Sequence, residues 1–139
     1  MLLTQNLTLY RSKRKIFEDI NISLSSGKII LLKGKNGSGK TSLIKTILNI
    51  LEPSNGCIYW KGKILKKNLY DYYNNITYIS DKISTIRQLS VNENITIWKK
   101  IFLSNISNQE INNILSLLNI DKFFNSKVST LSLGETKKL

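Results

Sequence analysis

A glycine-rich stretch with one lysine and one threonine carries the strongest chemical signal in the sequence. Residues 34–41 fit the pattern G-x-x-x-x-G-K-[ST] at every defined position. Glycines let such a segment curl so that successive backbone N–H groups point inward at a helix N-terminus and form an anion-binding nest. In that geometry Lys40 reaches the β- and γ-phosphates, and the Thr41 hydroxyl binds the Mg²⁺ that bridges them. We predict a nucleoside triphosphate site; the alternative is a glycine-rich turn without a ligand.

The residues on either side have the character that this loop requires. The apolar run 29–32 predicts a buried strand over 28–33 that leads into the loop. A helix is predicted to follow over about 41–51 and to end where Pro53 and Gly56 interrupt the pattern. Its apolar positions recur at helical spacing: Leu43, Ile44, Ile47, Leu48 and Leu51.

Two further strands are expected before the loop and two after it. The first should place Leu3, Gln5, Leu7 and Leu9 on one face, and the second should run from Ile16 to Leu24 after a basic, hairpin-like connection. Later strands are predicted over 57–60, followed by a tight turn at 61–62, and over 76–79. We also expect a short helix near 69–73.

The second half of the chain reads as helical. Residues 90–93 and 107–110 both match S-x-x-E, a capping box in which the serine and glutamate satisfy the first backbone donors of a helix. Apolar residues at helical spacing follow each box. Strands first and helices later suggest an α/β core with a helical subdomain.

Composition excludes several classes of function. The chain has 21 Lys and Arg against 9 Asp and Glu, a net charge of +12, but these residues are scattered apart from the clusters 11–15 and 61–67. We therefore do not expect nucleic acid as a partner. Cys57 is the single cysteine and there is no histidine, so an internal disulfide and histidine-based chemistry are excluded. The sequence shows no signal peptide and no apolar run long enough to cross a bilayer.

Several stretches together resemble the ABC-type ATPases. Residues 131–135 are similar to the L-S-G-G-Q signature of that family and follow Lys40 by about ninety residues, as the family spaces them. Residues 53–56, 61–62 and 89–94 resemble further family segments. The whole resembles most the ATP-binding subunit of the cytochrome c maturation (haem exporter) system.

The resemblance implies a fold, a ligand and partners. It implies the N-terminal part of an ABC ATPase, a P-loop NTPase fold with a mixed β-sheet around the loop strand and helix. Residues 1–80 would form the β-subdomain and loop core, and 81–139 a helical subdomain ending at the signature. Partners would be a second ATPase subunit and transmembrane transporter subunits, with the chain peripheral to the cytoplasmic face of the membrane or to the matrix side of the mitochondrial inner membrane.

The resemblance also assigns residues. Tyr10 is the candidate for stacking on adenine, although it could equally just end a strand. Residues 132 and 134 would face ATP held by the second subunit, although 132–135 is also a plain capping box. Mg-ATP would be bound by Gly34, Lys35, Asn36, Gly37, Ser38, Gly39, Lys40, Thr41 and Ser42, with Thr41 on the metal, and the signature would be Leu131, Ser132, Leu133, Gly134 and Glu135.

Three departures from the family pattern bear on catalysis. Lys82 stands where the family has a glutamine near Mg²⁺, and a cation there is electrostatically unfavourable. Glu135 replaces the glutamine that ends the family's signature, and its carboxylate would repel a γ-phosphate unless it turns away to cap its own helix. The family's strand ending in Asp-Glu, and its switch histidine, would lie beyond Leu139.

These departures lead to expectations about the core and the reaction. We expect a partly open core and absent or very slow hydrolysis by these residues alone. The alternatives to a transporter ATPase are a nucleotide-binding remnant, an ABC ATPase acting on nucleic acid and, least favoured, a small-molecule kinase.

Overall fold

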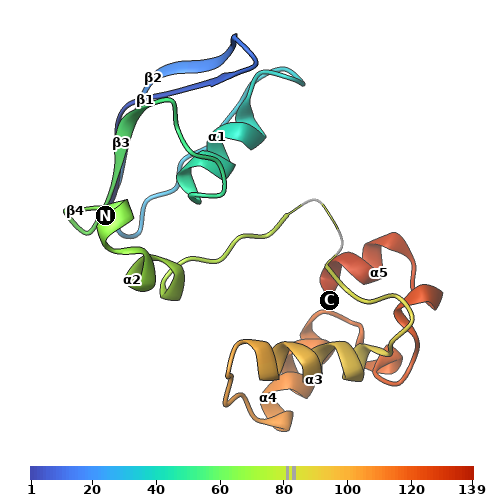
Figure 1. The fold of residues 1–139 in the computed structure, drawn as a ribbon. Coiled ribbons are helices and arrows are strands. Elements are labelled where there is room, and N and C mark those ends of the chain that lie inside the picture. The colour runs from blue at the N-terminus through green and yellow to red at the C-terminus, as the bar shows by residue number, and fades with distance from the viewer. Residues whose placement is uncertain (81, 83) are drawn as a thin grey trace. The chain divides into compact units, whose positions relative to one another are not determined.

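The computed structural model describes residues 1–80, 82 and 84–139, which form two compact units. Unit 1 comprises Met1–Tyr78, and unit 2 comprises Ile79–Leu139. Each unit has its own buried apolar cluster. Figure 1 shows the strands β1 to β4 in unit 1 and the helices α3, α4 and α5 in unit 2.

A four-stranded antiparallel sheet forms the framework of unit 1. Its strands are β1 (Leu2–Arg11), β2 (Arg14–Leu24), β3 (Asn55–Trp60) and β4 (Lys63–Ile64), in the order β2-β1-β3-β4. Ser12 and Lys13, with φ of 46° and 64°, make the two-residue turn between β1 and β2. Positive φ at both positions matches the twist of a tight hairpin. The predicted hairpin is confirmed, and β2 begins at Arg14, two residues before the predicted start.

The predicted inner face of the first strand is wrong in its first half. Gln5 is exposed, whereas Thr4, Leu7 and Leu9 are buried. Asn6 has a φ of 47°, and the register with both neighbouring strands shifts next to it. An irregularity of this kind adds a residue to one strand and so reverses which face the preceding residues occupy. The alternation of Ile20, Ile22 and Leu24 in β2 is as predicted.

Two helices and a short 3₁₀ turn complete unit 1: α1 (Lys40–Ile47), α2 (Leu69–Asn74) and η1 (Leu65–Lys67). Their apolar residues share one cluster with the sheet. Tyr72 is fully buried there, donates a hydrogen bond of 2.8 Å to the Ile47 carbonyl, and meets the Trp60 ring edge-on at 5.4 Å. The buried members are Leu7, Leu43, Ile58, Leu65 and Tyr72.

Two predicted strands, 28–33 and 76–79, do not form in the structure. Ile29 is 95% exposed, Leu31 73% and Ile79 89%. A strand exists only where a neighbour takes its backbone hydrogen bonds, and within the described ranges no strand pairs with either segment. The prediction of a buried loop strand is therefore wrong, and the prediction of a partly open core is confirmed.

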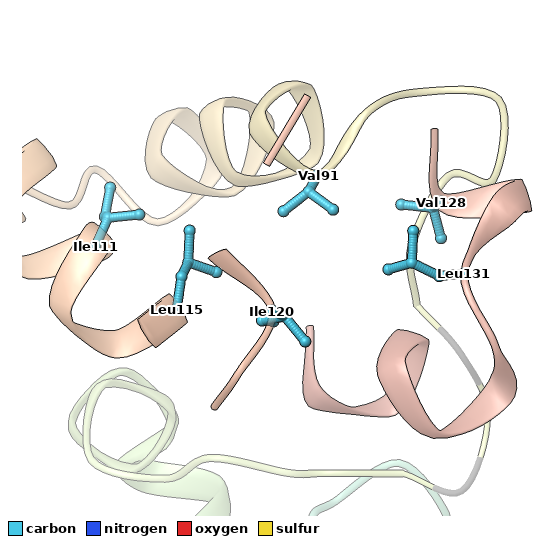
Figure 2. Close-up of a cluster of buried hydrophobic side chains, with 6 residues drawn as sticks. All are labelled: Val91, Ile111, Leu115, Ile120, Val128 and Leu131. Carbon is cyan, nitrogen blue, oxygen red and sulfur yellow. The ribbon is translucent and has the colours of Figure 1, made fainter. Parts of the chain in front are cut away.

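Unit 2 is helical, with α3 (Val91–Ile101), α4 (Asn108–Leu117), η2 (Asp121–Phe123), η3 (Val128–Thr130) and α5 (Leu133–Lys138). Figure 2 shows six aliphatic side chains from these elements and their connections converging into one core: Val91, Ile111, Leu115, Ile120, Val128 and Leu131. The serine of each S-x-x-E segment accepts a hydrogen bond from the glutamate N–H, and each glutamate accepts from the serine N–H. The predicted capping boxes are confirmed.

Asn94, directly after the first capping box, bonds to backbone groups of the segment before α3. Its side chain is buried, accepts a hydrogen bond of 2.8 Å from the Ile86 N–H, and donates to the Ile86 carbonyl at 3.1 Å. It also donates to the Ser90 carbonyl at 2.8 Å. Because buried backbone groups must be paired, this one side chain holds the segment that leads into α3.

Candidate phosphate-binding site

The segment between β2 and α1 curls tightly just before the helix. Gly37 and Gly39 have φ of 79° and 90°, in the left-handed region that favours glycine. The Ser38 N–H donates to the Lys35 carbonyl at 3.2 Å, which closes a turn, and α1 begins at Lys40. The loop therefore forms the bend that the pattern predicts although the strand before it is absent.

The N-terminus of α1 differs from those of α3, α4 and α5. No side chain caps it, and its first turn holds no acidic residue. Helices α3, α4 and α5 each begin with a serine–glutamate capping box, and α2, which has no side-chain cap, holds Asp71 in its first turn. The first N–H groups of a helix need acceptors and carry partial positive charge. At α1 these groups are left for an acceptor from outside the helix, and an anion fits that requirement.

A hollow of about 250 Å³ lies at this end of α1. Three of its lining residues are basic, and none of them is acidic. Beside the loop and the helix start, the first residues of β2 form its other wall. The lining consists of Arg14, Lys15, Ile16, Gly37, Ser38, Gly39, Lys40, Thr41 and Ser42. Positive side chains and backbone donors together favour a multiply charged anion.

The Lys40 side chain turns back onto its own loop. Its Nζ donates to the carbonyl oxygens of Gly34 and Lys35, at 2.7 Å each. A β-carbon on Gly34 would come within 2.7 Å of the Ser38 Oγ, so the two ends of the loop lie close together. Two of the predicted loop residues thus hold the lysine through their backbone, and Asn36 lies in the turn between them and the helix.

Tyr10 lies near the end of β1 and belongs to a polar cluster on the hairpin. Its hydroxyl donates to Glu18 Oε1 at 3.0 Å, and Lys15 Nζ donates to Glu18 Oε2 at 2.6 Å. These bonds lower the pKa of Glu18, with the Lys15 hydrogen bond as the largest cause, and raise the pKa of Tyr10 through its bond to the carboxylate. Tyr10 does not line the hollow, but its partner in the β1–β2 ladder, Lys15, does. Stacking on adenine stays a prediction.

Sequence reasoning missed the three β2 residues in the wall, Arg14, Lys15 and Ile16. The basic cluster 11–15 was the available signal, but nothing in the sequence indicated that it lies beside the loop. A β-carbon on Gly39 would come within 3.0 Å of Ile16 Cγ2 and 3.1 Å of the Ile16 carbonyl oxygen. This close approach, rather than any motif, sets the start of β2 beside the loop.

Lys82 and the predicted signature belong to unit 2, not to the unit that contains the hollow. Lys82 lies in a bend, where its N–H donates to Ser80 Oγ at 3.2 Å. Leu131 is a core residue (Figure 2), and Leu133 is exposed. Space around Gly134 is open. The roles assigned to these residues stay predictions.

Glu135 caps its own helix. It accepts from the Ser132 N–H and Oγ, both at 2.8 Å. The bond from the backbone N–H is the main reason that the pKa of Glu135 is lowered. The Glu135 carboxylate therefore accepts its hydrogen bonds at the start of α5.

A second hollow, of about 290 Å³, lies within unit 2 between α3, α4 and the end of α5. Its lining is apolar except for Ser104 and two lysines, Lys99 and Lys138. The hollow beside Lys40 is therefore the better candidate for binding a polyphosphate.

The donor set fits a magnesium nucleotide. Thr41 is exposed and lines the hollow, so its hydroxyl is accessible to a metal. Mg²⁺ is commonly held by few protein oxygens together with substrate phosphates and water. Among the described residues, no group of three or more His, Cys, Asp or Glu could hold a metal ion by itself. Thr41 together with phosphate oxygens is the arrangement that the described residues offer.

No helix among the described residues has both the length and the apolar character that a membrane crossing requires.

Residues 17–139 match the family model described as ABC transporter. The cytochrome c biogenesis ATP-binding export protein CcmA of Reclinomonas americana is 34% identical over 97% of this chain and 63% of its own length. The protein of that name from Vibrio vulnificus is 26% identical over 100% of this chain and 68% of its own.

Solved structures agree with these sequence relatives. A putative ABC transporter ATP-binding protein from Pyrococcus furiosus superposes with a TM-score of 0.83 at 24% identity, over 99% of this chain and 66% of that one. An ATP-binding cassette of an ABC transporter in its ADP conformation gives 0.74 at 25% identity, over 99% and 61%. The predicted fold class is confirmed, and this chain spans between 61% and 68% of the length of these four proteins.

Proposed function

Because the chain belongs to the ABC transporter family, which it matches over residues 17–139, we propose that it binds Mg-ATP at the loop before α1 as the ATP-binding part of a transporter. The observation that carries this proposal is the hollow at the uncapped N-terminus of α1, with three basic residues and no acidic residue in its wall. Backbone donors and cations gathered in this way suit a triphosphate.

Each loop residue has a role in the proposal. The N–H groups of Gly37 and of residues 39–42 hold phosphate oxygens, and Thr41 supplies one oxygen to Mg²⁺. Lys40 exchanges the carbonyl oxygens of Gly34 and Lys35 for the β- and γ-phosphates. That exchange replaces neutral acceptors by charged ones, which strengthens each hydrogen bond.

Transport is the broader part of the proposal. The chain acts with a second ATPase subunit and with transmembrane subunits, at the cytoplasmic face of a membrane or at the matrix side of the mitochondrial inner membrane. The relatives named as export proteins of cytochrome c biogenesis support export for that process. Haem is the exported molecule that the resemblance to the haem exporter implies. Nucleic acid is not part of the proposal.

Hydrolysis requires a group that polarises the attacking water. No carboxylate lines the hollow among the described residues. We therefore propose that the residues described bind ATP and hydrolyse it slowly by themselves. Phosphate release that matches a full transporter ATPase would contradict this part.

Calorimetric titration with Mg-ATP tests the binding. The unmutated chain should bind, and Lys40→Ala should lose most of the affinity because it removes the cation of the loop. Lys67→Ala is the matched control, since Lys67 is an exposed lysine of η1 outside the hollow. Equal affinities of Lys40→Ala and Lys67→Ala, or no binding by the unmutated chain, would overturn the proposal.

Removing the metal tests the role of Thr41. Chelation of Mg²⁺ should weaken ATP binding to the unmutated chain. In Thr41→Ala the affinities with and without Mg²⁺ should converge, because the protein oxygen that holds the metal is gone. Ser12→Ala, in the exposed hairpin turn, should retain the full metal dependence.

A further inference from the structure

The start of β2 forms a fixed wall of the phosphate hollow. Arg14, Lys15 and Ile16 all line it. Ile16 is held against Gly39, where even a β-carbon would come within 3.0 Å of its Cγ2. The tight turn at Ser12 and Lys13 sets the residue after it, Arg14, at the first position of the strand. Two cations are thus delivered to the hollow by a strand rather than by the loop.

These two cations differ in their ion pairing. Lys15 forms an ion pair of 2.6 Å with Glu18, so part of its charge is already balanced. Arg14 takes part in none of the ion pairs or side-chain hydrogen bonds found among residues 1–80, 82 and 84–139. A guanidinium also presents a planar fork of donors that matches two phosphate oxygens at once, which an ammonium does not.

We infer that Arg14 is a second phosphate-binding cation of this site, acting beside Lys40 on the polyphosphate of the bound nucleotide. The inference rests on the proposed function, since it names a further residue of the same hollow. It gives a purpose to one member of the basic cluster 11–15 that the loop pattern does not explain. Lys40 reaches the anion from the loop, and Arg14 reaches it from the start of β2.

The cross-strand partner of Arg14 provides the matched control. Arg11 pairs with Arg14 in the β1–β2 ladder, and both side chains are exposed, but Arg11 does not line the hollow. Arg11→Gln and Arg14→Gln remove the same charge from the same end of the hairpin. A general effect of net charge on binding must therefore appear in both variants. The loss of a direct contact with the ligand should appear only in Arg14→Gln.

Affinities for Mg-ATP, Mg-ADP and inorganic tripolyphosphate are measured by calorimetry for each variant. Arg14→Gln should weaken ATP and tripolyphosphate by about tenfold, the usual size for loss of a hydrogen bond to a charged group. Arg11→Gln should stay within about twofold, since screened charges outside the site contribute little. Arg14→Lys should lie between, because it keeps the charge and loses the fork. Circular dichroism spectra confirm that each variant is folded.

Two results would overturn the inference without overturning the proposed function. One is equal binding by Arg14→Gln and Arg11→Gln while Lys40→Ala loses affinity, which leaves the proposed function standing. The other is a loss for ATP without a loss for tripolyphosphate, which places the contact on the nucleoside. Failure of the unmutated chain to bind any of the three ligands would contradict the inference and the proposed function together.

Discussion

Gly39 and Ile16 touch at the point where the phosphate loop meets the sheet. The backbone of Gly39 has a φ of 90°, and a β-carbon built on it would lie 3.0 Å from the Ile16 Cγ2 methyl and 3.1 Å from the Ile16 carbonyl oxygen. The contact joins the N-terminus of α1 to the start of β2. It therefore sets both walls of the hollow, the donors of the loop on one side and the basic residues of the strand on the other.

Substitution of Gly39 by alanine should cost more than the same change at Gly37. Both glycines have positive φ, so both variants carry about 1–2 kcal/mol of backbone strain. Gly37 has nothing within 4 Å of a β-carbon, whereas Gly39→Ala also crowds Ile16, which adds about 1–3 kcal/mol. Urea denaturation in a Trp98→Phe background, where Trp60 reports on unit 1, measures the difference. Equal urea midpoints for the two variants would show that Ile16 can move to accept a β-carbon at position 39 without a cost in stability.

Two leucine-to-alanine substitutions should differ in their cost because one leucine of unit 1 is buried and the other is exposed. Leu7 is fully buried, so Leu7→Ala should lower the free energy of unfolding by about 2–5 kcal/mol. Leu31 is 73% exposed, so Leu31→Ala should change it by no more than about 0.5 kcal/mol. The same denaturation assay reads both. A large cost at Leu31 would mean that residues 28–33 are covered in solution.

Alkaline pH should destabilise unit 1 through Tyr72. Burial raises the pKa of Tyr72 to about 12. The folded state therefore holds this proton more tightly than the unfolded state, whose pKa is about 10. The stabilisation is complete below about pH 10 and is lost as the pH rises towards 12. In Tyr72→Phe this part of the decline should disappear, at the cost of about 1 kcal/mol at neutral pH for the bond to Ile47.

Tyr70 is the control for this titration, because it is 84% exposed on the same helix. Tyr70→Phe should follow the unmutated chain at every pH, because removing the hydroxyl from so exposed a side chain should change the free energy of unfolding by no more than about 0.5 kcal/mol. Unfolding free energies between pH 7 and 12 supply the comparison. A decline in Tyr72→Phe as steep as that in Tyr70→Phe would refute the assignment.

Two serines in identical capping boxes should distinguish a signature from a plain helix cap. Ser132→Ala and Ser107→Ala each remove a bond to the N3 backbone N–H, so each should cost unit 2 about 1 kcal/mol. Only Ser132 lies in the predicted signature, so only Ser132→Ala should weaken ATP-dependent dimerisation. Sedimentation velocity with and without Mg-ATP is the measurement. Equal dimerisation of the two variants would leave Ser132 as a cap alone.

Local features of this protein could be predicted from the sequence because their causes are local. The loop before α1 follows from the order of glycines, Lys40 and Thr41, and the helix starts at Ser90, Ser107 and Ser132 follow from a glutamate three residues later. Each depends on hydrogen bonds between residues a few positions apart. The sequence also predicted a hairpin-like connection in the basic stretch before Ile16, but only the structure places the turn itself at residues 12 and 13.

Features that depend on distant partners were decided by the tertiary structure. The apolar run 28–33 has the composition of a strand, but no neighbour among the described residues takes its hydrogen bonds, so it stays exposed. The irregularity at Asn6 reversed the face of Gln5 through pairing with two other strands. Arg14 entered the wall of the hollow only because Ile16 packs on Gly39, a contact between residues that the sequence sets far apart. Short-range hydrogen bonds are encoded in order along the chain, whereas pairing and packing are fixed by whichever surfaces the folded chain brings together.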